Sequence, residues 1–152
     1  MTRPATTTHT YPVTGNAFGL PLLIISALQL MVVLDGTVVN LALARIHVEL
    51  GLTASLRSWI VTSYALAYGG LLLLGGRLGD VFGRKRTFLI GVSMFTLASL
   101  ACGLANGAGV LLVARVIQGI GAAVASPTAM ALIVVTFAPG KPRNQAFSVF
   151  AM

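Results

Sequence analysis

Charged residues are scarce in this chain, and acids are the scarcest of them. Only 9% of the 152 residues are charged, and three are Asp or Glu against ten that are Lys or Arg. The hydrophobic share is 57% and the mean hydropathy is +0.93. A soluble domain of this size cannot bury so much apolar surface. The composition therefore predicts an all-α integral membrane protein.

Cysteine and tryptophan occur only once each, and the single cysteine, Cys102, lies inside an apolar run. One cysteine with no neighbouring ligand residues predicts neither a disulfide framework nor a bound metal. A net charge of +7 would suggest nucleic acid in a soluble chain, but no basic face or set of base-stacking aromatics accompanies it. No loop holds a nucleophile beside a base, so we do not expect an enzyme.

Four apolar runs are each long enough to cross a bilayer core of roughly 30 Å at about 1.5 Å per helical residue. We expect membrane-crossing helices over Ala17–Ala44, Trp59–Gly76, Thr87–Ala105 and Val110–Phe137. The first run is too long for a signal peptide and contains a carboxylate, so it is expected to remain as a helix. Ser58 is the expected N-cap of the second helix.

These runs divide the chain into three parts. Residues 1–16 are expected to form a cytoplasmic tail, residues 17–144 a four-helix transmembrane region, and residues 145–152 the start of an incomplete fifth helix. The segment 138–144 contains two prolines and a glycine, and is expected to be the loop before that fifth helix.

Cations are distributed unequally between the two ends of the expected helices. Arg45 and Arg57 fall on one side, and seven fall on the other: Arg3, Arg77, Arg84, Lys85, Arg86, Lys141 and Arg143. Cytoplasmic loops of membrane proteins carry the excess of Lys and Arg. The distribution predicts a multi-pass protein of the cell membrane whose N-terminus is cytoplasmic.

The segment GGRLGDVFGRKR, residues 75–86, is expected to be a short loop between the second and third helices. Gly75 and Gly79 have the spacing of close helix packing, and Gly83 would permit a tight reversal. Asp80 could cap another helix or pair with a cation of the loop. The segment lacks the GxxxxGK[ST] spacing of a phosphate-binding loop. Its candidate gating residues are Gly76, Gly79, Asp80, Gly83, Arg84, Lys85 and Arg86.

Asp35 is the acid that interrupts the first apolar run. A carboxylate near the centre of a membrane helix costs about 2.5–3.5 kcal/mol on insertion scales, so it requires a reason. Burial in hydrocarbon disfavours the charged form, so such an acid can take up and release a proton near neutral pH. We expect a proton or cation site here. The alternative is an acid that only hydrogen-bonds a neighbouring helix.

Arg115 lies inside the fourth apolar run, at a depth that overlaps that of Asp35. We expect both groups to face one aqueous cavity and to influence each other's protonation. The alternative is that Arg115 extends to the outer headgroups. Helical spacing places polar and small residues on the face of Arg115. The candidate cavity residues are Gln118, Gly119, Ala122 and Ser126, with Tyr64 and Tyr68, which could instead be packed.

Three segments together resemble the N-terminal half of a major facilitator superfamily transporter, in particular its fourteen-helix drug:proton antiporter branch. LDGTVVNLAL (34–43) resembles the first-helix signature, GRLGDVFGRKR (76–86) the signature between helices two and three, and RVIQGIGAA (115–123) the fourth-helix signature. The resemblance implies proton handling by Asp35, proton coupling by Arg115, and gating by residues 76–86.

The same resemblance implies proton-coupled efflux of drugs or other small amphipathic molecules, driven by a proton gradient without a cofactor. The partners would be the lipid bilayer and a small-molecule substrate, with no nucleic acid. Family members have more helices than this chain, so the remaining helices would be missing and the chain is not expected to transport unaided. Two alternatives stay open: a family member that exports a metabolite, and a small membrane protein that acts by association and transports nothing.

Overall fold

The computed structural model describes residues 19–49 and 53–151, so the predicted tail lies outside the described residues. Five helices follow one another: α1 (Leu20–Glu49), α2 (Ala54–Phe82), α3 (Arg84–Gly103), α4 (Ala108–Thr136) and α5 (Lys141–Phe150). The first four are long and apolar enough to cross a membrane. The prediction of an all-α membrane fold with four spans is confirmed.

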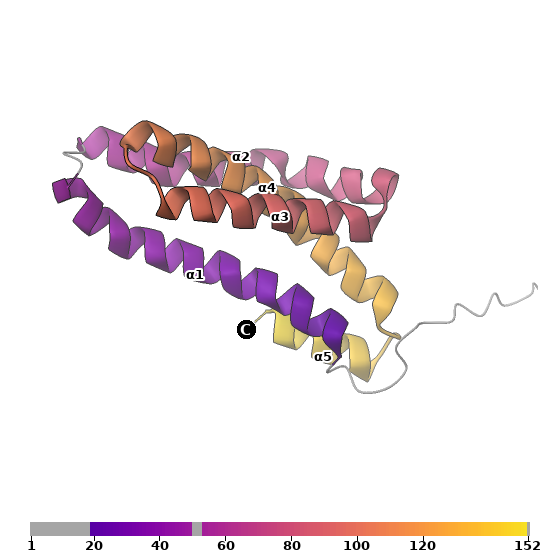
Figure 1. Ribbon diagram of the computed structural model, residues 1–152. Coiled ribbons are helices and arrows are strands. Elements are labelled where there is room, and N and C mark those ends of the chain that lie inside the picture. Colours follow the sequence, from indigo (N-terminus) through magenta and orange to yellow (C-terminus); the bar gives the residue numbers. More distant parts are fainter. Residues whose placement is uncertain (1–18, 50–52, 152) are drawn as a thin grey trace, which may run out of the picture.

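Helix α4 is the centre of the bundle. It packs extensively against α2 and α3, while α1 contacts it much less and lies to one side with α5 (Figure 1). Close approach depends on glycine. A Cβ at Gly75 of α2 would collide with the backbone carbonyl of Ala123 in α4, and one at Gly121 of α4 would lie 2.6 Å from the backbone nitrogen of Phe95 in α3. The predicted packing role of Gly75 is confirmed.

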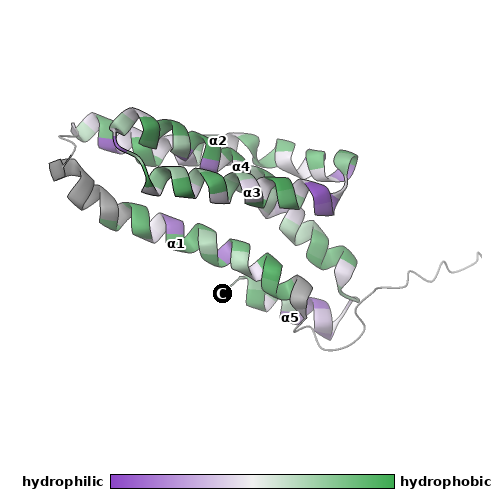
Figure 2. Cartoon of the chain, viewed as in Figure 1, coloured by the Kyte–Doolittle hydropathy of each residue, from purple (hydrophilic) through white to green (hydrophobic). Residues whose placement is uncertain are grey.

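Large apolar side chains cover the outside of the bundle. Leu73 is 86% exposed, Leu41 is 70% exposed and Leu66 is 68% exposed. Apolar residues run along the helices, and hydrophilic residues gather at the α2–α3 corner (Figure 2). Leucines of this kind are stable in contact with lipid, and would be costly to hold in water. The surface is that of a membrane-embedded bundle.

Residues 75–86 are helical almost throughout, and the predicted loop is wrong. Helix α2 continues to Phe82 and α3 begins at Arg84, so Gly83 alone separates them. Its φ is +90°, a value that glycine adopts without strain because it has no Cβ. Gly75 and Gly79 lie inside α2 and face α4, in keeping with their predicted packing role, and helix packing outweighs their low helix propensity.

Two further helix starts differ from the prediction. Thr53, rather than Ser58, caps α2, because its side-chain oxygen accepts a hydrogen bond from the Leu56 backbone nitrogen at 3.3 Å. Ser58 lies inside the helix and donates to the Ala54 carbonyl. Helix α5 begins at Lys141 rather than at Gln145, because Pro142 stands in its first turn, where proline fits a helix.

The start of α1, the α2–α3 corner and the α4–α5 corner lie at the same end of the bundle (Figure 1). The described members of the predicted cytoplasmic set of cations belong to this end: Arg77, Arg84, Lys85, Arg86, Lys141 and Arg143. Arg57, near the start of α2, belongs to the opposite end. Arg3 and the side chain of Arg45 lie outside the described residues.

Candidate functional site

A buried ion pair joins α1 to α4 in the middle of the bundle. Arg115 NH1 lies 2.6 Å from Asp35 Oδ2, and the two side chains are only 3% and 10% exposed. The guanidinium therefore points into the protein, and the alternative in which it extends to the headgroups is wrong. Two opposite charges at this separation compensate much of the cost of removing each from water.

Gln118 lies one helical turn after Arg115 and contacts both members of the ion pair. Its Nε2 donates to Asp35 Oδ1 at 2.6 Å, and its Oε1 accepts from Arg115 NH1 at 2.9 Å. Residues three apart on a helix are neighbours on one face, which is why Gln118 can reach the group that Arg115 holds. Both carboxylate oxygens of Asp35 thus have a donor.

An aromatic pair from α2 covers the guanidinium. The Arg115 Cζ lies 4.4 Å from the centre of the Tyr64 ring, a cation–π contact. Tyr68 stacks on Tyr64 with the ring centres 6.0 Å apart and the planes 3° from parallel. Tyr64 is thus packed against the ion pair, with Tyr68 behind it. These two residues had been left open between a ligand-facing and a packed position.

Helix α3 supplies two site residues that the sequence did not indicate. Ser99 Oγ accepts from Gln118 Nε2 at 2.7 Å, and Cys102 Sγ donates to Gln118 Oε1 at 3.7 Å. Their spacing of three residues places them on one helix face, but a serine and a cysteine among apolar residues are common in membrane helices. The guanidinium Nε of Arg115 is buried with no hydrogen-bond partner among the described residues.

Two of the predicted cavity residues are buried in helix contacts instead. A Cβ at Gly119 would lie 2.6 Å from the Tyr64 carbonyl, so this residue permits α4 to touch α2. Ala122 is fully buried, and Ser126 is half-buried. The expectation that Gly119 and Ala122 line a cavity is wrong for the described residues, because small residues on this face serve close packing rather than access.

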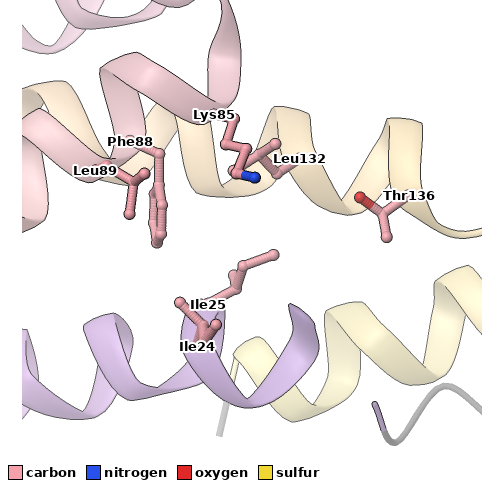
Figure 3. A pocket seen from close by; sticks show the side chains of 7 residues that line it. All are labelled: Ile24, Ile25, Lys85, Phe88, Leu89, Leu132 and Thr136. Carbon is pink, nitrogen blue, oxygen red and sulfur yellow. The ribbon is translucent and has the colours of Figure 1, made fainter. Parts of the chain in front are cut away.

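A cleft of about 330 Å³ lies nearer the cationic end, between α1, α3 and α4 (Figure 3). Isoleucines of α1 face Phe88 and Leu89 of α3 across it, and the Lys85 side chain reaches over it. Its lining residues are Ile24, Ile25, Lys85, Phe88, Leu89, Leu132 and Thr136. None of the predicted cavity residues belongs to this lining.

Polar contacts fix the α2–α3 corner. Arg84 NH2 lies 3.3 Å from Asp80 Oδ1, and Arg84 NH1 donates to the Ala131 carbonyl of α4 at 3.5 Å. Thr87 Oγ1 donates to the carbonyls of Leu78 and Gly83. Of the two options predicted for Asp80, the described residues show the cation pair. Asp80 is 68% exposed, so this pair contributes little stability.

Membrane-crossing helices that enclose a buried acid and guanidinium define a class of protein, the helical membrane proteins with ionisable groups at membrane depth. Residues 25–152 match the family model of the Major Facilitator Superfamily. The chain therefore belongs to this family, as the resemblance of its three signatures predicts.

Curated relatives agree with this assignment. The chain is 47% identical, over 90% of its length, to the MFS-type transporter EfpA of Mycobacterium tuberculosis. It is 50% identical over 85% of its length to the puromycin resistance protein of Streptomyces alboniger, and 45% identical over 74% to the lincomycin resistance protein of Streptomyces lincolnensis. The chain spans about a quarter of the length of these relatives, whose covered shares are 26%, 26% and 23%.

Proposed function

We propose that this chain supplies the first four membrane helices, and the start of a fifth, of a proton-coupled exporter of drugs or other small amphipathic molecules. The observation that carries the proposal is the buried Asp35–Arg115 pair, which joins two helices that otherwise touch little. The names of the puromycin and lincomycin resistance relatives support export of drug-like molecules. The proton gradient is the proposed energy source, and no cofactor or enzymatic step is invoked.

In the proposed mechanism, the ionised carboxylate of Asp35 holds α1 against α4 through Arg115. Arg115 keeps its charge at any accessible pH, so the acid is the partner whose charge changes. A proton on Asp35 cancels most of the attraction, and α1 is then free to move relative to α4. Movement of one helix group against another exposes a midplane site to alternate sides of the membrane in secondary transporters.

The α2–α3 corner acts in this proposal as a conformational latch. Asp80, Arg84 and the Ala131 carbonyl connect the ends of α2 and α3 to α4, so a movement of α4 is transmitted to the corner. The excess of cations at this end supports the proposed location of the corner, and of the N-terminus, on the cytoplasmic side of the cell membrane, by the positive-inside rule. Because the matched segment is only about a quarter of each relative, we propose that transport requires further helices beyond these.

Two other functions are distinguished by the same experiment. A family member that exports a metabolite would keep the ion pair but give no drug resistance. A non-transporting membrane protein would give no drug resistance and would not depend on the ion pair. The test is a hybrid in which residues 25–152 replace the matching segment of the puromycin resistance protein, expressed in a puromycin-sensitive bacterium.

We expect the hybrid to lower puromycin accumulation, and Asp35→Asn to abolish this effect. The matched control is Arg57→Gln, which removes an exposed charge near the start of α2, at the end of this helix away from the α2–α3 corner. The 152 residues expressed alone should not export puromycin. Export by the Asp35→Asn hybrid at the rate of the Arg57→Gln hybrid would contradict proton coupling through Asp35.

A further inference from the structure

The side-chain amide of Gln118 uses all of its hydrogen-bonding capacity. Its nitrogen donates to Asp35 Oδ1 at 2.6 Å and to Ser99 Oγ at 2.7 Å. Its oxygen accepts from Arg115 NH1 at 2.9 Å and from Cys102 Sγ at 3.7 Å. A glutamine amide has two donor hydrogens and two acceptor lone pairs, so every position is filled. The side chain is fully buried, so water does not compete for these positions.

The two charged partners permit only one orientation of this amide. If the amide turned by half a rotation, its oxygen would face the Asp35 carboxylate and its NH₂ group would face the Arg115 guanidinium. Both contacts would be repulsive. Ser99 does not choose between the two orientations, because a hydroxyl can either donate or accept. The ion pair therefore sets the direction of the amide, and α3 holds it in place.

A proton arriving at Asp35 must disturb this arrangement. Oδ2 accepts from Arg115 and Oδ1 accepts from Gln118, so a proton on either oxygen weakens one of the two bonds. Helix α3 packs extensively on α4, whereas α1 packs on α4 far less. Gln118 and Ser99 consequently belong to α4 and α3, which stay packed together, whereas Asp35 belongs to α1, the helix that can separate from them.

We propose that Ser99 is a positioning residue that, acting through Gln118, determines the pH at which Asp35 takes up its proton. The inference rests on the proposed function, in which Asp35 titrates. An N–H held in place by Ser99 is ready to donate to the ionised carboxylate and favours that form. Without the Ser99 hydroxyl the amide keeps its orientation but is held less firmly, so its N–H donates more weakly to Asp35 and the acid takes up its proton at a higher pH.

The surroundings of Asp35 contain few other groups that could produce such a shift. Among the described residues, the charged and titratable groups that act on the site are Arg115 of α4, Tyr64 of α2 with Tyr68 behind it, and Cys102 of α3. Each is left in place by a substitution of Ser99. The effect of Ser99 can therefore be measured separately from theirs.

Infrared titration of the 152-residue chain in lipid vesicles tests the proposal. The chain contains only three Asp and Glu residues, so the band of the protonated Asp35 carboxyl is assigned by its absence from Asp35→Asn. We expect Ser99→Ala to raise the pH midpoint of this band by about 0.5 to 1 pH unit, the equivalent of one interhelical hydrogen bond in a membrane. Ser99→Thr keeps a hydroxyl and should restore the original midpoint.

Two more variants complete the comparison. Ser93→Ala removes an exposed hydroxyl from the same helix and should leave the midpoint unchanged. Cys102→Ala removes the weaker bond on the other side of the amide and should raise the midpoint by a smaller amount. If Ser99→Ala loses its helical circular dichroism, Cys102→Ala provides the test, and an unmoved midpoint there overturns the proposal.

The outcomes separate this inference from the proposed function. A midpoint in Ser99→Ala equal to that in Ser93→Ala overturns the positioning role of Ser99 while leaving Asp35 as the titrating acid. A shift that Ser99→Thr does not reverse assigns the effect to packing and also overturns it. An Asp35 band that does not titrate in the unsubstituted chain overturns the proposed function itself.

Discussion

Replacing Gly75 by alanine should destabilise the bundle although alanine is the better helix former. A Cβ at this position would collide with the Ala123 carbonyl and lie 2.8 Å from the carbonyl carbon of that residue and 2.9 Å from Val124 Cα. These atoms are all backbone of α4, so no side chain can rotate away and α2 itself must move. Overpacking of this kind costs about 1–3 kcal/mol.

Gly69 on the same helix provides the matched control, because a Cβ there would meet nothing within 4 Å. Gly69→Ala should stabilise the protein by up to about 1 kcal/mol through helix propensity alone. Gly75→Ala has the same gain in propensity and the additional clash. The two variants should therefore differ by about 1–3 kcal/mol in the free energy of unfolding.

The assay is reversible unfolding in detergent micelles by titration with a denaturing detergent, followed by circular dichroism. Equal unfolding midpoints for Gly75→Ala and Gly69→Ala would refute the claim that α2 and α4 are in backbone contact at Gly75. A Gly75→Ala variant more stable than the unsubstituted chain would refute it more strongly.

Five other substitutions test three separate contacts by the same unfolding measurement. Asp35→Asn and Arg115→Gln should each lower the free energy of unfolding by about 3–5 kcal/mol, because each leaves a buried partner unpaired. The double variant should lose clearly less than the sum of the two single losses. Strictly additive losses would contradict the ion pair. Thr53→Ala should lower the free energy of unfolding by about 1 kcal/mol through loss of the α2 cap, whereas Ser58→Ala should lower it much less. The reverse order would favour Ser58 as the N-cap, as expected from the sequence. Asp80→Asn should change the free energy of unfolding by less than about 1 kcal/mol, and by less still at high salt. A larger loss would show that the exposed pair with Arg84 contributes more stability than its exposure implies.

The membrane fold was predictable because its signal is carried by many residues together. Four apolar runs of sufficient length require helices in a bilayer, and the alternation of cation-rich and cation-poor connections indicates which helix ends lie on the same side of the membrane. The ends of the helices were harder to place. The segment 75–86 was expected to be a loop because glycine is a weak helix former, although Gly75 and Gly79 also have the spacing of helix packing. Their lack of a side chain is what lets α2 touch α4. Only the position of the neighbouring helix distinguishes these two meanings of glycine.

The two charges of the candidate site were predictable for a related reason. An acid and a guanidinium at membrane depth are costly, so Asp35 and Arg115 stand out in an apolar sequence. Ser99 and Cys102 carry no comparable cost, and their roles follow only from the rotation of α3 relative to Gln118. Gly119 was misassigned to a cavity because small residues on a helix face can indicate either access for a ligand or contact with a helix.

The central claim is that the charge of Asp35 holds α1 against α4. It is tested most directly by the distance between spin labels at Val38 of α1 and Val113 of α4, both exposed, in a Cys102→Ala background in lipid vesicles. A single short distance is predicted at alkaline pH, a second and longer distance at acid pH, and the longer distance at every pH in Asp35→Asn. Identical distance distributions at both pH values, with or without Asp35, would contradict the account.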